Sequence, residues 1–117
     1  MKLSTAMRIG SMTTRQIKRQ WSDGGNGRCA LGAIASAYGF NDLEGGNNCL
    51  TQIFNKYAVL SIAFPHPIDG KYYPLSSIIA DLNDNCSYSR EQIADWIEEV
   101  IEKDETLNET KRLQEVA

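Results

Sequence analysis

The sequence has one histidine, three cysteines, three prolines and no hydrophobic run approaching the about 20 residues needed to span a bilayer. Cys29, Cys49 and Cys86 form no Cys-x-x-Cys pair and cannot all pair within one chain, so we expect reduced thiols. No apolar segment lies between Lys2 and Arg8, which argues against a secretory signal. These absences predict a cytoplasmic protein that uses no membrane.

Signatures of cofactor chemistry are also lacking. The glycine run at 24–27 is not followed by the Gly-Lys-Ser/Thr of a nucleotide-binding loop. A lone histidine without paired metal ligands leaves no complete catalytic or metal-binding signature. We therefore expect no cofactor and no resident metal.

The overall composition is that of an ordinary globular protein. Of the 117 residues, 42% are hydrophobic and 23% are charged, which argues against a disordered or fibrous chain. One domain over residues 1–105 accounts for this length, and the polar segment 106–117 is predicted to be a frayed tail.

Charge is distributed unevenly along the chain. Residues 1–28 carry six basic and one acidic side chain, a net +5, whereas residues 29–117 carry six basic and fourteen acidic ones, a net −8. Arg15, Lys18 and Arg19 could contact an acidic partner or nucleic acid. We favour the simpler interpretation that the basic end faces the acidic C-terminal helix of the same molecule, because no aromatic residues for base stacking are interleaved.

The segment after the glycine run predicts a buried helix. Between Cys29 and Tyr38 no residue is charged and most side chains are small, so the helix is apolar on nearly every side. Gly39 is a natural C-terminal stop. We expect this helix, from about 28 to 38, to be the centre of the fold.

Further helices are predicted from apolar periodicity and capping signals. A short first helix over 5–9 is capped by Ser4 and ended by Gly10. Longer ones follow near 13–21, 48–60, 74–82 and 89–103, with a capping box at Ser89 to Gln92. Asn83 is expected to bridge loops, and Asp84 to cap the last helix. The fold class is thus mainly α, a compact single-domain helical bundle around the buried central helix, with one short β-hairpin possible near 62–73.

Four segments resemble a group of small uncharacterised proteins encoded by bacteria and their phages. They are Leu3-Ser4 to Ile9-Gly10, Cys29-Ala30-Leu31-Gly32-Ala33, Leu82-Asn83-Asp84 and Ser89-Arg90-Glu91-Gln92-Ile93-Ala94-Asp95-Trp96. Cys86 and Tyr88 replace a histidine and a tryptophan of that group, and a C-P-x-C pair before Leu82 is missing. The resemblance implies a shared fold and a phage or prophage ancestry, and it implies no activity.

Cys29 is the first candidate for chemistry. A thiol at the first turn of a helix beside Arg28 is placed to favour the thiolate, and His66 with Asp69 or Asp84 could supply a base and an orienting carboxylate. Packing in an apolar helix explains the same cysteine more simply. Zinc held by Cys29, Cys49, Cys86 and His66 has suitable atom types but no short paired spacing.

The glycine run suggests a second candidate site. Gly25, Asn26, Gly27 and Arg28 resemble an anion cradle that precedes a helix, although a tolerant surface loop is the simpler interpretation. Taken together, the sequence favours a non-enzymatic interaction protein that binds a macromolecule, most simply a protein, through its charged surface. The alternative is a small thiol enzyme that uses Cys29 as nucleophile with His66 as base.

Overall fold

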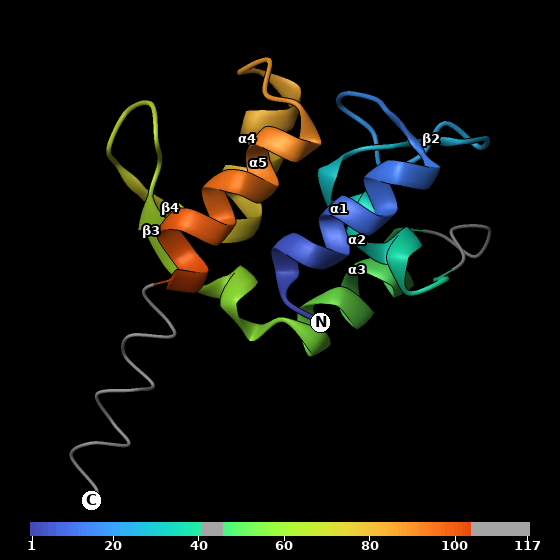
Figure 1. Ribbon diagram of the computed structural model, residues 1–117, viewed down its shortest axis with the longest axis horizontal. Coiled ribbons are helices and arrows are strands. Elements are labelled where there is room, and N and C mark those ends of the chain that lie inside the picture. Colours follow the sequence, from blue (N-terminus) through green and yellow to red (C-terminus); the bar gives the residue numbers. More distant parts are fainter. Residues whose placement is uncertain (41–45, 104–117) are drawn as a thin grey trace, which may run out of the picture.

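The computed structural model describes residues 1–40 and 46–103, so the predicted tail at 106–117 lies outside the described residues (Figure 1). The five α-helices described are α1 (Leu3–Thr13), α2 (Ala30–Ala37), α3 (Gly46–Lys56), α4 (Leu75–Asp84) and α5 (Arg90–Trp96). A 3-10 helix, η2 (Ala58–Ser61), follows α3, and a π-helix, η3 (Ile97–Glu102), continues α5. The prediction of a mainly α protein is confirmed.

Two small sheets accompany the helices. Strands β1 (Arg15–Gln16) and β2 (Gly27–Arg28) pair in parallel, and β3 (Ala63–Pro65) and β4 (Tyr72–Pro74) form an antiparallel hairpin in which Phe64 lies opposite Tyr73. The hairpin predicted near 62–73 is therefore present, and it stands at one end of the molecule (Figure 1). Among the described residues no helix has both the length and the apolarity to cross a membrane.

The first helix is longer than predicted, because Gly10 does not end it. Gly10 is buried against α2, and a Cβ atom built there would lie 2.9 Å from Ala33 Cα and would overlap the carbonyl group of Ala33. The glycine thus allows the backbones of α1 and α2 to approach closely at this position. The predicted cap also differs, because Ser4 lies inside the helix and Lys2 is the N-cap residue.

The helix predicted at 13–21 is wrong. Thr14 to Gln16 are extended, Arg15 and Gln16 pair with β2, and Arg19 adopts a positive φ of 63°. Arg90 fixes this path: its guanidinium donates to the carbonyl and hydroxyl oxygens of Thr14, both at 2.6 Å. Tertiary hydrogen bonds therefore override the local helical pattern.

Helix α2 begins two residues later than predicted. Cys29 is its N-cap, and the Cys29 sulfur accepts a hydrogen bond of 3.4 Å from the Gly32 amide. Five residues of α2 are buried, and the helix contacts α1, α3 and α4. Gly39, with φ at 70°, follows the end of the helix as expected.

The later helices follow the predicted pattern with shifted bounds. The helix expected at 48–60 is divided into α3 and η2, and the one expected at 89–103 into α5 and η3. The capping box is confirmed, because the Ser89 hydroxyl accepts from the Gln92 amide and the Gln92 side chain accepts from the Ser89 amide. Asp84 does not cap α5; it ends α4 and accepts instead from the Arg19 amide at 2.8 Å.

Helix η3 is hydrogen-bonded to the first turn of α1. The Glu102 carboxylate of η3 accepts from the amide and the hydroxyl of Ser4, at 2.9 and 2.7 Å. This buried carboxylate at the first turn of α1 accepts from an amide that the helix itself leaves unpaired. Arg8 pairs with Asp95 and Glu98, each at 2.7 Å, so part of the basic N-terminal region does face the acidic C-terminal helix.

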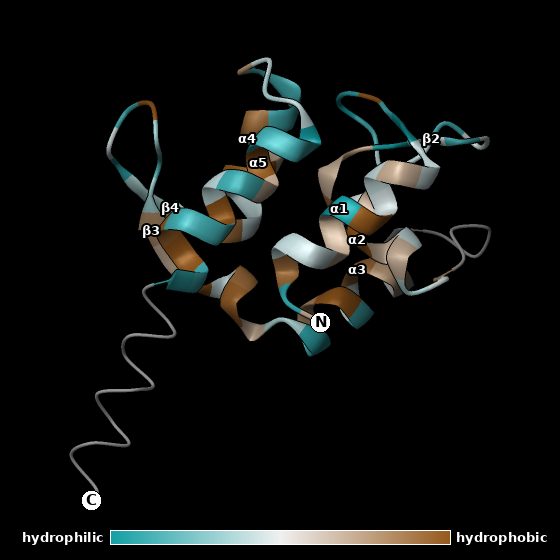
Figure 2. Cartoon of the chain, viewed as in Figure 1, coloured by the Kyte–Doolittle hydropathy of each residue, from teal (hydrophilic) through white to brown (hydrophobic). Residues whose placement is uncertain are grey.

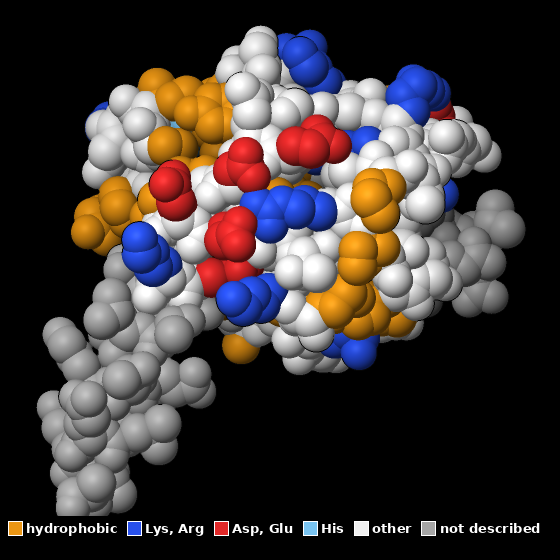
Figure 3. All heavy atoms as spheres, in the orientation of Figure 1, with side chains coloured by type: hydrophobic (Ala, Val, Ile, Leu, Met, Phe, Trp, Pro, Cys, Tyr) orange, Lys and Arg blue, Asp and Glu red, His pale blue; other side chains and the backbone are white. Residues whose placement is uncertain are grey.

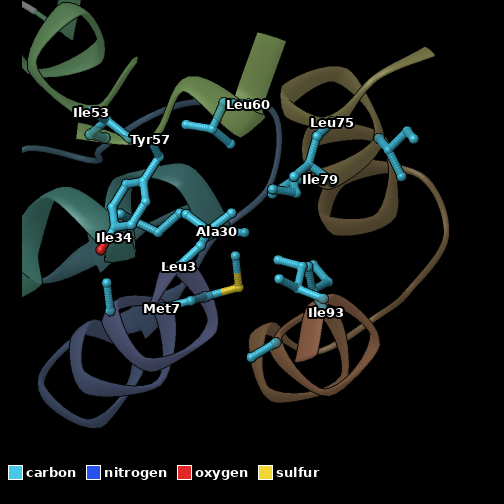
Figure 4. Close-up of a cluster of buried hydrophobic side chains, with 14 of the residues drawn as sticks. Leu3, Met7, Ala30, Ile34, Ile53, Tyr57, Leu60, Leu75, Ile79 and Ile93 are labelled. Atoms are coloured by element: carbon cyan, nitrogen blue, oxygen red, sulfur yellow. The ribbon is translucent and has the colours of Figure 1, made fainter. Parts of the chain in front are cut away.

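One hydrophobic cluster joins all five α-helices. Figure 4 shows its side chains converging from α1, α2, α4 and α5, with Ile53 and Leu60 above them. Figure 2 shows hydrophobic and hydrophilic residues on different sides of α5. Residues fully removed from solvent include Met7, Ile34, Ile53, Leu60, Leu75, Ile79 and Ile93.

Candidate functional site

The single histidine is buried at the centre of a cluster of polar side chains. His66 follows β3 and is 5% exposed. Its Nε2 lies 2.7 Å from Asp81 Oδ2 of α4, and its Nδ1 accepts a hydrogen bond of 3.1 Å from the Ile68 amide. Because Nδ1 acts as an acceptor, the ring proton of the neutral histidine lies on Nε2 and is donated to Asp81.

Asp81 also contacts residues that follow α4. Its Oδ1 accepts from the Asn85 side chain at 2.8 Å, and its Oδ2 lies 3.5 Å from the Cys86 sulfur, which donates to it. Hydrogen bonds from Asn85, His66 and Cys86 hold the pKa of Asp81 below its usual value. Burial and the nearby Asp81 carboxylate raise the pKa of the Cys86 thiol.

A pocket of about 270 Å³ adjoins this cluster between the hairpin and α4. It is lined by His66, Asp69, Tyr73, Ser77, Ile78 and Asp81. Asp69 accepts from the Lys71 amide at 2.8 Å and from the Tyr73 hydroxyl at 2.9 Å, which lowers the pKa of Asp69. The hydrogen bond from the Tyr73 hydroxyl to Asp69 raises the pKa of Tyr73. Two carboxylates face this pocket, so its chemistry favours a cation.

The structure does not bring Cys29 and His66 together. Cys29 lines a different pocket, of about 190 Å³, with Asp84 among its neighbours. Burial raises the pKa of the Cys29 thiol, and this effect exceeds that of the helix amides that favour the thiolate. The guanidinium of Arg28 donates to Ser22 and to the carbonyls of Gly25 and Gly27. The expected activation of Cys29 is therefore opposed by its surroundings.

The four residues considered for zinc are likewise separated. Cys49 is a buried member of the hydrophobic cluster, and Cys29 lines the 190 Å³ pocket. Only His66 and Cys86 share a polar cluster, and they do so through Asp81.

The amides of the glycine run are occupied by a carboxylate of the same loop. Asp23 Oδ1 accepts from the amides of Gly25 and Gly27, both at 2.9 Å, and these bonds lower the pKa of Asp23. Arg15 forms an ion pair with the same carboxylate. An external anion at Gly25, Asn26, Gly27 and Arg28 would have to displace Asp23.

The three basic residues singled out for partner binding all have exposed side chains. Arg15 lies on β1, Lys18 follows it, and Arg19 borders the Cys29 pocket. They do not share a helical face, because Arg15 lies on a strand and Lys18 and Arg19 lie in the irregular segment after it.

Asp81 is the residue of this site that sequence reasoning missed. It lies on α4, where the sequence pattern predicted only the apolar face formed by its neighbours. One signal was available: a histidine between two prolines must find hydrogen-bond partners if it is buried. The sequence does not show which carboxylate provides them.

Comparisons with protein-family models, with curated proteins and with solved structures returned no match for this chain.

Proposed function

We propose that this chain is a non-enzymatic protein-binding module that contacts its partner with the β3–β4 hairpin. The observation that carries the proposal is the position of its exposed apolar side chains. Half of the large hydrophobic residues exposed in the described chain lie on the hairpin or immediately before it: Ile62, Ile68, Tyr72 and Tyr73. Tyr72 is 70% exposed and Ile68 is 60% exposed. Such a concentration of apolar surface is typical of an interaction site.

The hairpin is suited to side-chain contacts. Pro65 lies on β3 and Pro74 on β4, and proline in an edge strand discourages the addition of a further strand. Exposed tyrosines are common at the centres of protein interfaces, where they bury a large area at a low entropic cost. Figure 3 shows hydrophobic side chains on the hairpin side of the molecule, separated by charged residues from those over α1.

Backbone hydrogen bonds and the buried histidine hold the hairpin in one conformation. The His66 amide donates to the Lys71 carbonyl at 2.8 Å, and the Gly70 amide donates to the His66 carbonyl at 2.9 Å. Asp81 then ties the His66 ring to α4. A surface that is ordered before binding loses less conformational entropy when a partner docks.

The proposal includes a phage or prophage origin, supported by the sequence resemblance alone, and a cytoplasmic location, supported by three free thiols. A helical bundle with α2 at its centre is the architecture we propose. The exposed Arg15, Lys18 and Arg19 would contribute charge to the partner contact, with nucleic acid as a less favoured target. The thiol-enzyme alternative lacks a base beside the nucleophile, because Cys29 and His66 line different pockets.

Site-specific photocrosslinking tests this proposal. A photoreactive phenylalanine analogue would replace Tyr72 in the full chain, and Met12, which is 79% exposed on α1, would provide the matched control position. We expect one discrete adduct from position 72 after irradiation in a bacterial lysate and none from position 12. An Ile68→Ser change in the same chain should reduce that adduct several-fold.

Two results would count against the hairpin. One is an adduct that forms equally from positions 72 and 12. The other is an adduct that is unchanged by Ile68→Ser and is abolished by Lys18→Ala with Arg19→Ala, which would transfer the binding surface to the basic segment.

A further inference from the structure

We propose that His66, Asp81 and Cys86 form a binding site for Zn²⁺ or a chemically similar divalent metal ion. The site lies beneath the hairpin, where the end of β3 meets α4 and the turn after α4. It is independent of the partner-binding proposal, because it concerns buried and half-buried side chains rather than the exposed apolar surface.

The three side chains already provide converging ligand atoms. A ring nitrogen of His66, a carboxylate oxygen of Asp81 and Cys86 Sγ all lie within 4.8 Å of one another. Asp81 Oδ2 is 2.7 Å from the histidine nitrogen and 3.5 Å from the sulfur. An ion at the centre of this triangle would reach ligand distances of roughly 2.0 to 2.3 Å after small side-chain movements.

The atom types favour zinc over magnesium or calcium. One nitrogen, one sulfur and one oxygen suit a borderline-soft cation, whereas Mg²⁺ and Ca²⁺ prefer oxygen ligands throughout. With the Cys86 thiolate and the Asp81 carboxylate, a divalent ion gives a site with no net charge. A neutral site is compatible with the buried His66, and the adjoining pocket leaves room for a water molecule as the fourth ligand.

Binding requires two proton movements. The Cys86 thiol releases its proton to solvent, and the His66 proton moves from Nε2, which then binds the metal, to Nδ1. Nδ1 can then no longer accept the hydrogen bond from the Ile68 amide. Ile68 is exposed at the tip of the hairpin, so its amide can turn to water, and the loss of one such bond is small beside the binding of a zinc ion. Metal binding should therefore break the hydrogen bond between the Ile68 amide and His66 Nδ1.

The test uses the reduced full chain, free of any affinity tag, titrated with Zn²⁺ alone by calorimetry. We expect one ion per chain, and an affinity that Cys86→Ser lowers by more than about 100-fold, because changes outside the ligand set alone cost roughly 10- to 100-fold. Cys29→Ser is the matched control, since it removes a half-buried thiol from another pocket and should leave the affinity unchanged. Co²⁺ in place of Zn²⁺ should give a thiolate charge-transfer band that Cys86→Ser abolishes.

Amide NMR provides the second measurement. Zn²⁺, and not Mg²⁺, should shift the Ile68 amide signal and speed its hydrogen exchange. The proposal is overturned if the folded wild-type chain binds no Zn²⁺, if Cys86→Ser binds it equally well, or if the Ile68 amide is unaffected at saturation. A thermal melt of Cys86→Ser verifies that any lost affinity belongs to a folded protein.

Discussion

Replacing Gly10 with alanine should destabilise this protein, although the same change inside a helix normally stabilises the helix. Gly10 lies in α1 where the helix meets the backbone of α2. A methyl group there would overlap the carbonyl of Ala33 and approach its Cα to 2.9 Å. Backbone atoms cannot rotate away as a side chain can, so the two helices would have to move apart.

The size of the effect follows from two opposing contributions. Alanine favours a helix over glycine by about 1 kcal/mol. Overpacking a well-filled contact costs about 1 to 3 kcal/mol, and a clash with backbone belongs at or above the upper end of that range. The expected net loss is about 2 kcal/mol or more, a large part of the roughly 5 to 15 kcal/mol that stabilises a domain.

Urea denaturation followed by circular dichroism measures this loss, with the midpoint and slope compared between variants. Gly32→Ala provides a milder case, because its nearest contacts would be Trp21 O at 2.7 Å and Arg28 side-chain atoms at 3.3 Å. Met12→Ala, on the exposed face of α1, should change stability by no more than about 0.5 kcal/mol. If Gly10→Ala proves as stable as the wild type, the close approach of α1 and α2 is refuted.

Three further predictions follow from buried or paired groups. In a variant whose other two cysteines are replaced by alanine, Cys29 should react with maleimide at neutral pH more slowly than free cysteine does, because its pKa is raised. Rapid reaction near pH 6 would restore the thiol-enzyme hypothesis. Because the folded pKa of Asp23 lies below its ordinary 3.8, its contribution to stability is present above about pH 4 and is lost as pH falls through the folded value. As the pH is lowered, the urea midpoint of Asp23→Asn should therefore fall less steeply than that of the wild type. Equal pH dependence of the two midpoints would contradict this. Ser4→Ala and Glu102→Gln should each cost about 1 kcal/mol, and a double-mutant cycle should show coupling rather than additivity.

Local signals predicted the second half of the fold better than the first. The capping box at Ser89 and Gln92 depends on atoms three residues apart, so it forms wherever the helix forms. The apolar faces of α4 and α5 repeat at the helical period, and both helices are present. In these segments the local preference and the tertiary packing agree.

The first half differs because distant residues change the local outcome. Gly10 has the local properties of a helix stop, yet burial against Ala33 keeps it inside α1. Residues 13–21 have an amphipathic pattern, yet β2 and Arg90 provide hydrogen bonds that hold residues 14–16 extended. Arg90 lies more than seventy positions further along the sequence, and no local pattern connects it with Thr14.

The candidate site shows the same division. The sequence by itself determined the types of residue present: one histidine between two prolines, three thiols that form no local pair, and apolar spacing for a mainly α protein. Only the tertiary structure decided which of them meet. It separated His66 from Cys29 and placed it against Asp81 and Cys86, because the hairpin docks on α4. Helical periodicity is set by neighbours in the chain, whereas a cluster of polar side chains is set by which elements pack together.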